Sequence, residues 1–109
     1  MGKKKTNENE DIPLVSDIDK LIHEPARLLI MSLLYVVESS DFQFLKTQTK
    51  LTDGNLSSHL SKLEDARYVL VEKKYKGKKP MTKLSLTDEG REAFMRYKEE
   101  MDKILKIQG

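Results

Sequence analysis

The chain has 109 residues, of which 38% are hydrophobic and 35% charged, with a formal net charge of +2; this fits one domain and excludes an enzyme with a separate substrate domain. It contains no cysteine, which excludes disulfides, thiolate metal sites and cysteine nucleophiles. No apolar run approaches the roughly 20 residues that span a membrane, and the polar N-terminus is unlike a signal peptide, so we expect a cytoplasmic protein.

The N-terminal residues 1–12 are polar and show no apolar periodicity, which predicts a flexible tail. Ser16 is expected to cap a short helix, because Asp17 and Asp19 would then lie in its first turn, where acidic groups suit the helix dipole. The apolar face of this helix would consist of Ile18, Leu21 and Ile22.

A second helix is expected to open at Pro25, since proline fits the first helical turn. Residues 26–37 are apolar almost all round, which predicts the buried central helix of the fold. The polar residues 39–41 then interrupt the pattern and can cap a third helix that ends near Thr49. Its apolar anchors would be Phe42, Phe44 and Leu45.

A fourth helix is expected over residues 53–66, with Thr52 and Asp53 as candidate caps. Its apolar stripe has the spacing of one helical face and consists of Leu56, Leu60 and Leu63.

The sides of this fourth helix away from the leucine stripe carry short polar side chains. Asn and Ser are poor interior helix formers, because their side chains compete for backbone hydrogen bonds. Their clustering therefore favours contact with base edges and phosphates over an ordinary solvent face. The expected DNA-contacting residues of this helix and its cap are Thr52, Asn55, Ser57, Ser58, His59, Ser61 and Lys62. For His59, packing at the edge of the core is an equal alternative, since it lies near the leucine stripe.

The pattern changes to that of strands after the fourth helix. Residues 68–74 are rich in strand formers and residues 83–86 alternate polar and apolar, with Gly77 and Pro80 marking a turn between them. We therefore expect a two-stranded hairpin.

The hairpin region is strongly basic, because residues 62–83 hold eight basic and three acidic residues. This local excess suggests an anionic partner, and on charge alone an ordinary solvated turn is an equal alternative. Lysine suits phosphate neutralisation, so residues 74–83 are expected to lie on DNA phosphates. The expected contacts are Lys74, Lys76, Lys78, Lys79 and Lys83.

A last helix is expected after Thr87 and through about Ile107, with residues 88–109 forming a dimerisation helix. Apolar residues recur along it at intervals of three and four, close to a coiled-coil seam. We expect this face to pair with a second copy; folding back on its own domain is the alternative. The expected dimerisation residues are Ile18, Leu21, Ile22, Phe94, Tyr97, Met101, Ile104 and Leu105.

The predicted fold is mainly α with a small antiparallel β-hairpin (α+β). Short helices followed by a basic hairpin are the layout of a winged helix-turn-helix, here residues 13–87. The fourth helix would enter the major groove of double-stranded DNA, and the hairpin would be the wing.

The chain also resembles the compact MarR/ArsR-like winged-helix transcriptional regulators of bacteria and archaea over about residues 16–107. The resemblance rests on IHEPARLLIMSLL, on TDGNLSSHLSKLEDARYVLVEKKYKGKKPMTKLSLTDEGREAF, and on the long last helix. It implies a dimeric DNA-binding regulator with Ser57, Ser58 and His59 in the reader helix and Lys78, Lys79 and Lys83 in the wing. Such sequences usually place glycine after the reader helix, where this chain has Arg67. Arg67 either adopts a left-handed conformation or ends the helix differently.

These observations predict a sequence-specific transcriptional regulator, most simply a repressor, that acts as a homodimer without enzymatic activity or cofactor. A winged-helix protein-interaction module and a non-specific architectural DNA binder are the alternatives. His23 is expected to be a junction residue. With only two distant histidines and no cysteine, no metal site is expected.

Overall fold

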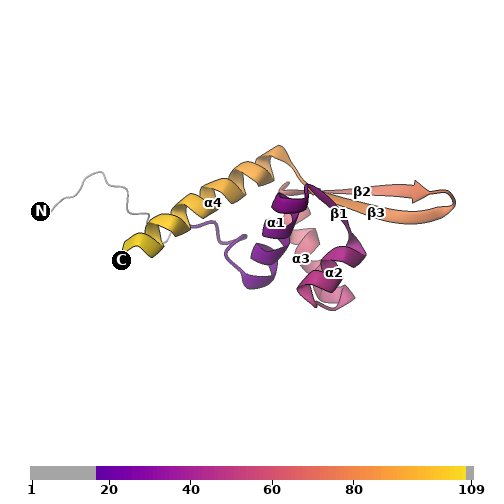
Figure 1. Ribbon diagram of the computed structural model, residues 1–109, viewed down its shortest axis with the longest axis horizontal. Helices are drawn as coiled ribbons and strands as arrows, with labels where there is room; N and C mark the ends of the chain where they lie inside the picture. The colour runs from indigo at the N-terminus through magenta and orange to yellow at the C-terminus, as the bar shows by residue number, and fades with distance from the viewer. Residues whose placement is uncertain (1–16, 108–109) are drawn as a thin grey trace, which may run out of the picture.

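The computed structural model describes residues 17–107, which contain four α-helices and one three-stranded antiparallel sheet. Three helices, α1 to α3, pack together into a body. The β2–β3 hairpin and the long helix α4 project from this body in opposite directions (Figure 1). The α+β architecture expected from the sequence is confirmed, and the hairpin and the last helix are its two extensions.

Helix α1 (Pro25–Val37) lies at the centre of the body, as predicted. The side chain of Glu24 caps it by accepting a 2.8 Å hydrogen bond from the Arg27 N–H, and Pro25 takes a first-turn position where no N–H is needed. Ile30, Met31 and Leu34 are fully buried. The helix is not buried on every side as expected, however, because the side chain of Val36 is 77% exposed.

The prediction of a short helix around residues 16–22 is wrong for the described part of this segment, since residues 18–24 form bends and turns. The cause is Asp19, whose Oδ1 accepts hydrogen bonds from the N–H groups of Leu21 (2.9 Å) and Ile22 (3.2 Å). A short acidic side chain that binds nearby N–H groups offers the backbone an alternative to helix. Ser16, the expected cap, lies outside the described residues.

Helices α2 (Phe42–Thr49) and α3 (Asp53–Asp65) have the expected positions. The Asp41 side chain caps α2 by accepting from the Phe44 N–H, and the Thr52 hydroxyl caps α3 by accepting from the Asn55 N–H. The residues before α2 were expected to interrupt the helical pattern and to cap this helix, and they also form strand β1 (Ser39–Asp41), which was not expected.

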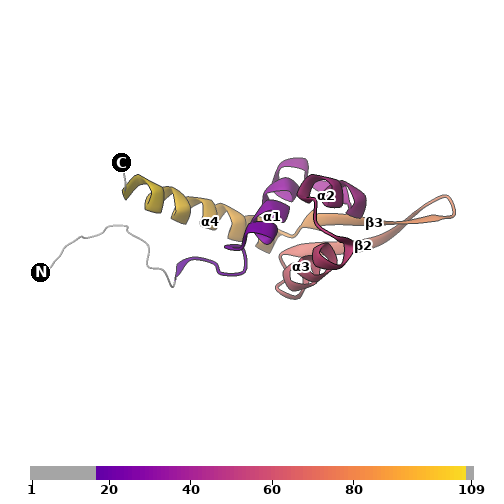
Figure 2. The same cartoon turned by 90° about the horizontal axis from the view of Figure 1, so that it is seen from below.

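The sheet has the strand order β1-β3-β2, with β2 at Val69–Lys76 and β3 at Lys79–Leu86. The two long strands are joined by the tight turn Gly77–Lys78, where Gly77 has a φ of +66°. Positive φ at the first turn position fits the type II′ turns that connect twisted hairpin strands. Strand β1 pairs only with the base of β3, so the outer part of the hairpin is a free two-stranded ribbon (Figure 2).

The core joins α1, the leucine stripe of α3, the base of the hairpin and the first half of α4 (Asp88–Ile107). This arrangement corrects part of the expected dimer face. Ile22, Phe94 and Tyr97 are at most 5% exposed within the single chain, so they pack on their own domain, as the alternative held. Met101 and Ile104 are half-buried, while Leu105 is 66% exposed.

Candidate nucleic-acid interface

Helix α3 has one apolar face and one polar face. Its leucine stripe is buried under α1 and the sheet, which turns the opposite side outward. The outward residues are exposed, and their side chains form no hydrogen bond or ion pair with residues 17–107. They are Asn55, Ser57, Ser58, Ser61 and Lys62. Thr52 is also exposed, but its hydroxyl is already engaged as the helix cap.

His59 lies on a different side of α3 from these residues. Its Nδ1 accepts a 3.1 Å hydrogen bond from Arg27 Nη1, and Arg27 Nε donates to the carbonyl of Leu21 (2.6 Å). The Glu24 carboxylate is farther from His59 Nδ1, at 3.9 Å. Arginine is always a donor, so the short contact fixes this nitrogen as an acceptor. The geometry favours the core-edge interpretation of His59 over a DNA contact.

Glu24 completes this cluster at the start of α1. The N–H of Arg27 donates to its carboxylate, and this bond holds the pKa of Glu24 below its usual range. The cluster ties residues 21–27 to α3, and so fixes the position of the helix that carries the exposed polar face.

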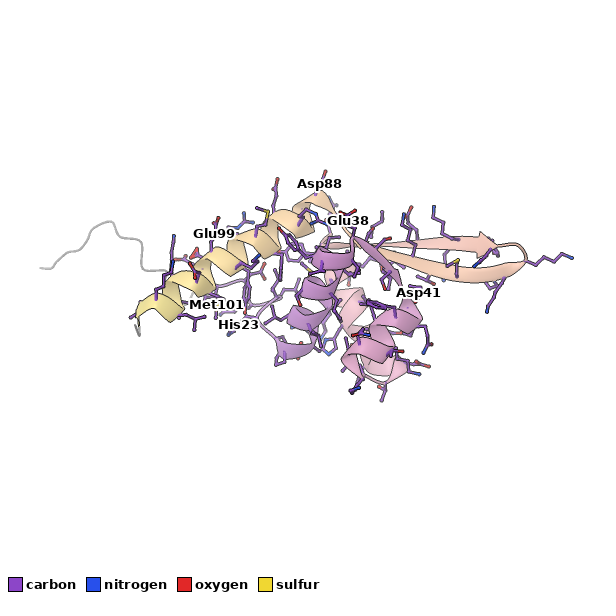
Figure 3. All side chains as sticks on the ribbon, in the orientation of Figure 1. His23, Glu38, Asp41, Asp88, Glu99 and Met101 are labelled. Carbon is purple, nitrogen blue, oxygen red and sulfur yellow. The ribbon has the colours of Figure 1, made fainter. Side chains whose placement is uncertain are left out.

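The polar face of α3 continues onto the hairpin. A shallow hollow of about 180 Å³ is bordered on one side by Ser57, Ser61 and Glu64 of α3 and on the other by Lys73 and Thr82 of the hairpin. Side chains of the two elements therefore border the same hollow. Figure 3 shows side chains projecting from the hairpin ribbon beyond the body.

The register of the hairpin divides its side chains between two faces. Val71 pairs with Leu84, which is buried against the body, so Lys73 and Tyr75 share the face that continues from α3. The alternate positions point to the other face of the ribbon. The expected wing contacts at those positions are Lys74, Lys76, Lys79 and Lys83. Lys73 belonged to the basic run but not to the expected contacts, because the sequence does not reveal which face of the hairpin meets α3.

The wing lysines carry little internal neutralisation. Lys74 lies 3.8 Å from Glu72, whereas the other hairpin lysines form no ion pair with the described part of the chain. They are Lys73, Lys76, Lys78, Lys79 and Lys83.

The junction between α3 and β2 resolves the question raised by Arg67, which adopts a left-handed conformation with a φ of +65°. Its N–H donates to the carbonyl of Glu64, and the N–H of Tyr68 donates to the carbonyl of Leu63, both at 2.9 Å. This is the hydrogen-bond pattern of a Schellman cap. The helix thus ends as it would with glycine, at a steric cost.

Helix α4 is fastened to the same junction. The Thr87 hydroxyl donates to the carbonyl of Arg67, accepts from the N–H of Gly90 and so caps α4. A Cβ at Gly90 would lie 2.1 Å from the carbonyl oxygen of Tyr68. The first turn of α4 therefore lies directly on the end of the reader helix.

Two tyrosine hydroxyls hold the segment before α1. Tyr68 donates to Asp19 Oδ2 (2.6 Å), and burial together with this bond raises the pKa of Tyr68 to about 12. The Tyr97 hydroxyl and His23 Nδ1 share a hydrogen bond of 2.7 Å, which makes His23 a junction residue as predicted. Burial also raises the pKa of Tyr97.

Residues 17–107 contain neither a metal-binding cluster nor a membrane-spanning helix. No group of three or more His, Cys, Asp or Glu side chains lies close enough to hold a metal ion there. None of the helices in that range is long and apolar enough to cross a membrane.

Comparison with known proteins agrees with this geometry. A sequence family described as a winged helix DNA-binding domain matches residues 26–105, and the chain belongs to that family. The fold and the DNA-binding class expected from the resemblance are therefore confirmed.

Similar proteins come from both archaea and bacteria. An uncharacterised protein of Methanocaldococcus jannaschii is 38% identical over 78 residues, which are 72% of this chain and 85% of that protein. A transcriptional regulator homologue from Pyrococcus horikoshii OT3 superposes with a TM-score of 0.75 at 29% identity, over 80% of this chain and 86% of that one. A MarR-family protein of Porphyromonas gingivalis W83 shares the fold, with a TM-score of 0.62, 18% identity and coverage of 95% and 96%.

Proposed function

We propose that this protein is a homodimeric, sequence-specific transcriptional regulator that binds double-stranded DNA through α3 and the hairpin. Helix α3 enters the major groove, and the wing (residues 74–83, together with Lys73) lies along the flanking phosphates, with the face that carries Lys73 and Tyr75 turned toward the DNA. Repression by covering a promoter is the simplest outcome of such binding.

The observation that carries the proposal is the exposed polar face of α3, whose side chains form no hydrogen bond within residues 17–107. Beside it lie the hairpin lysines, of which only Lys74 is near an acidic side chain. Serine and asparagine side chains that form no hydrogen bond within residues 17–107 have free donors and acceptors for base edges. The lysines beside them supply the phosphate-binding component that positions a protein on DNA. The family membership and the regulator homologue from Pyrococcus horikoshii OT3 support the same function.

The proposal includes a two-fold dimer built on the second half of α4, where Met101, Ile104 and Leu105 follow one another at helical spacing. Within the single chain Met101 packs at the edge of the core and Ile104 is half-buried, while Leu105 is exposed. A dimer would hold two α3 helices for half-sites about one helical turn of DNA apart.

The decisive experiment is selection of duplexes from a random oligonucleotide pool, followed by a salt titration on a selected and a random duplex. We expect a sharp, two-fold symmetric motif and a steep fall in affinity as salt rises. Enrichment of no motif would indicate an architectural binder, and no binding at low salt would indicate a protein-interaction module; either result would overturn the proposal.

Variants of the α3 face test its role in base recognition. Asn55→Ala and Ser58→Ala should relax the selected motif, with a loss of about 1–3 kcal/mol of discrimination per base contact. Thr47→Ala, an exposed change on α2, is the control and should leave the motif intact. An unchanged motif in both α3 variants would mean that another surface reads the bases.

A further inference from the structure

The tip of the wing carries an aromatic side chain that has no structural role in the described chain. Tyr75 is 73% exposed, and neither its ring nor its hydroxyl contacts a partner that would hold it in place within residues 17–107. The other tyrosines are engaged: Tyr68 and Tyr97 in hydrogen bonds, and Tyr35 under the cations of Arg91 and Lys98. The ring of Tyr75 is therefore free to contact a partner outside the described chain.

The register gives this ring an apolar neighbour. Tyr75 pairs with Pro80, one step from the Lys76–Lys79 pair that closes the two-residue turn. In such a hairpin the pair next to the closing pair is not hydrogen-bonded, so its side chains approach closely and proline loses no ladder bond. The phenol and the pyrrolidine ring therefore form one exposed apolar area at the wing tip.

The surroundings of this apolar area are cationic. Lys73 lies on the same face toward α3, and Lys74, Lys76, Lys78 and Lys79 surround the tip. The partner that fits an apolar ring among ammonium groups is a polyanion that also presents apolar surface. The sugar-phosphate wall of a DNA groove has both, because each deoxyribose lies between two phosphates.

We propose that Tyr75, together with Pro80, packs on deoxyribose of the duplex flank next to the segment bound by α3. This inference rests on the proposed function, since it assumes that DNA lies along the face shared by α3 and the wing. Tyr75 then contributes affinity that depends little on salt, while the lysines contribute the salt-dependent part.

The affinity test compares Tyr75→Ala and Tyr75→Phe with the wild type on one duplex across a salt series. Tyr75→Ala should weaken binding about tenfold without changing the slope of log affinity against log salt, since no charge is lost. Tyr75→Phe should stay within about twofold because the ring carries the contact. Wild-type affinity in Tyr75→Ala would overturn the inference.

A direct test uses the absence of tryptophan from the chain. Tyr75→Trp places a single fluorophore on the proposed contact, and Met81→Trp places it on the other face of the ribbon as the matched control. Labelled-DNA anisotropy shows when the duplex is bound. At that point Tyr75→Trp should be protected from acrylamide quenching, and Met81→Trp should not.

The outcomes separate this inference from the proposed function. If the wild type binds DNA while the tryptophan at position 75 stays as accessible to acrylamide as before, only the inference fails. Equal protection at positions 75 and 81 would also overturn it, because shielding would then not be specific to one face. Protection by phosphatidylserine vesicles but not by DNA would overturn both.

Discussion

Single residues at the α3–β2 junction determine how the reader helix joins the rest of the molecule. Gly90 allows α4 to lie on the carbonyl of Tyr68, and Arg67 takes the left-handed position at which glycine is favoured. Position 90 therefore requires the absence of a side chain, while position 67 accepts a side chain at a steric cost.

Gly90→Ala should destabilise the fold. The added Cβ would lie 2.1 Å from a backbone oxygen that cannot move without breaking the junction. We expect a loss of about 2 kcal/mol in unfolding free energy by denaturant titration, because overpacking outweighs the helix propensity of alanine. Gly54→Ala is the control: it meets no atom within 4 Å and should be neutral or stabilising. Equal stability of the two variants would contradict this account.

The hydroxyl of Tyr68 should make stability depend on alkaline pH. Its pKa is about 12 in the folded chain against 10 for the free side chain, so folding favours the protonated form. The stabilisation is complete below pH 10 and is lost as the pH rises toward 12, because the unfolded chain gives up this proton first. The stability difference between wild type and Tyr68→Phe should therefore shrink between pH 10 and pH 12. A constant difference across that range, measured by urea unfolding, would argue against the bond to Asp19.

At the scale of elements, the proposed complex assigns phosphate neutralisation to the wing and base recognition to α3. Replacing Lys78 and Lys79 with alanine should weaken binding to all duplexes and flatten the salt slope by about one to two units. The control replaces two exposed lysines far from the wing, Lys20 and Lys103. An unchanged slope in the wing variant would remove the tip lysines from the interface.

The elements that could be predicted from the sequence are those with a local signal. Pro25, the Thr52 cap and the leucine stripe of α3 placed two helices within a residue or two of their observed ends. Strand β1 was missed because its three residues carry no strand pattern and pair with β3 more than 40 residues away. The turn at Asp19 was missed because the same acidic residue suits a helix start.

In the candidate site, too, only features with a local sequence signal could be predicted. The exposed face of α3 follows from the position of its leucines, so its members could be predicted. His59 could not be placed, since its orientation depends on Arg27 of another helix. The face of the hairpin on which each lysine lies depends on the register at Val71 and Leu84, which the sequence does not display.

At the scale of the whole molecule, α4 has two functions along its length. Its first half completes the core through Phe94 and Tyr97, and its second half extends beyond the body (Figure 1). The heptad-like pattern could not separate these functions, because burial in a domain and burial between copies require the same spacing.

Leu105→Glu should shift the proposed dimer toward monomer, because a carboxylate buried between two apolar helices loses its hydration. Sedimentation velocity should show the smaller species, and affinity for a two-half-site duplex should fall by at least about tenfold. Met95→Glu adds the same charge on another side of α4 and should leave the oligomeric state unchanged. A wild-type chain that sediments as a monomer would end the dimer proposal.

The close seating of Gly90 on Tyr68 has a mechanical consequence. Gly90 leaves no room for a methyl group between α4 and the Tyr68 carbonyl, so the start of α4 and the α3–β2 junction pack as one unit. A helix of 20 residues is about 30 Å long, so a shift of about 3 Å at its far end corresponds to a rotation of about 6° at the pivot. If two copies pair through the far half of α4, as proposed, the angle between the paired helices therefore also sets the orientation of the two α3 helices.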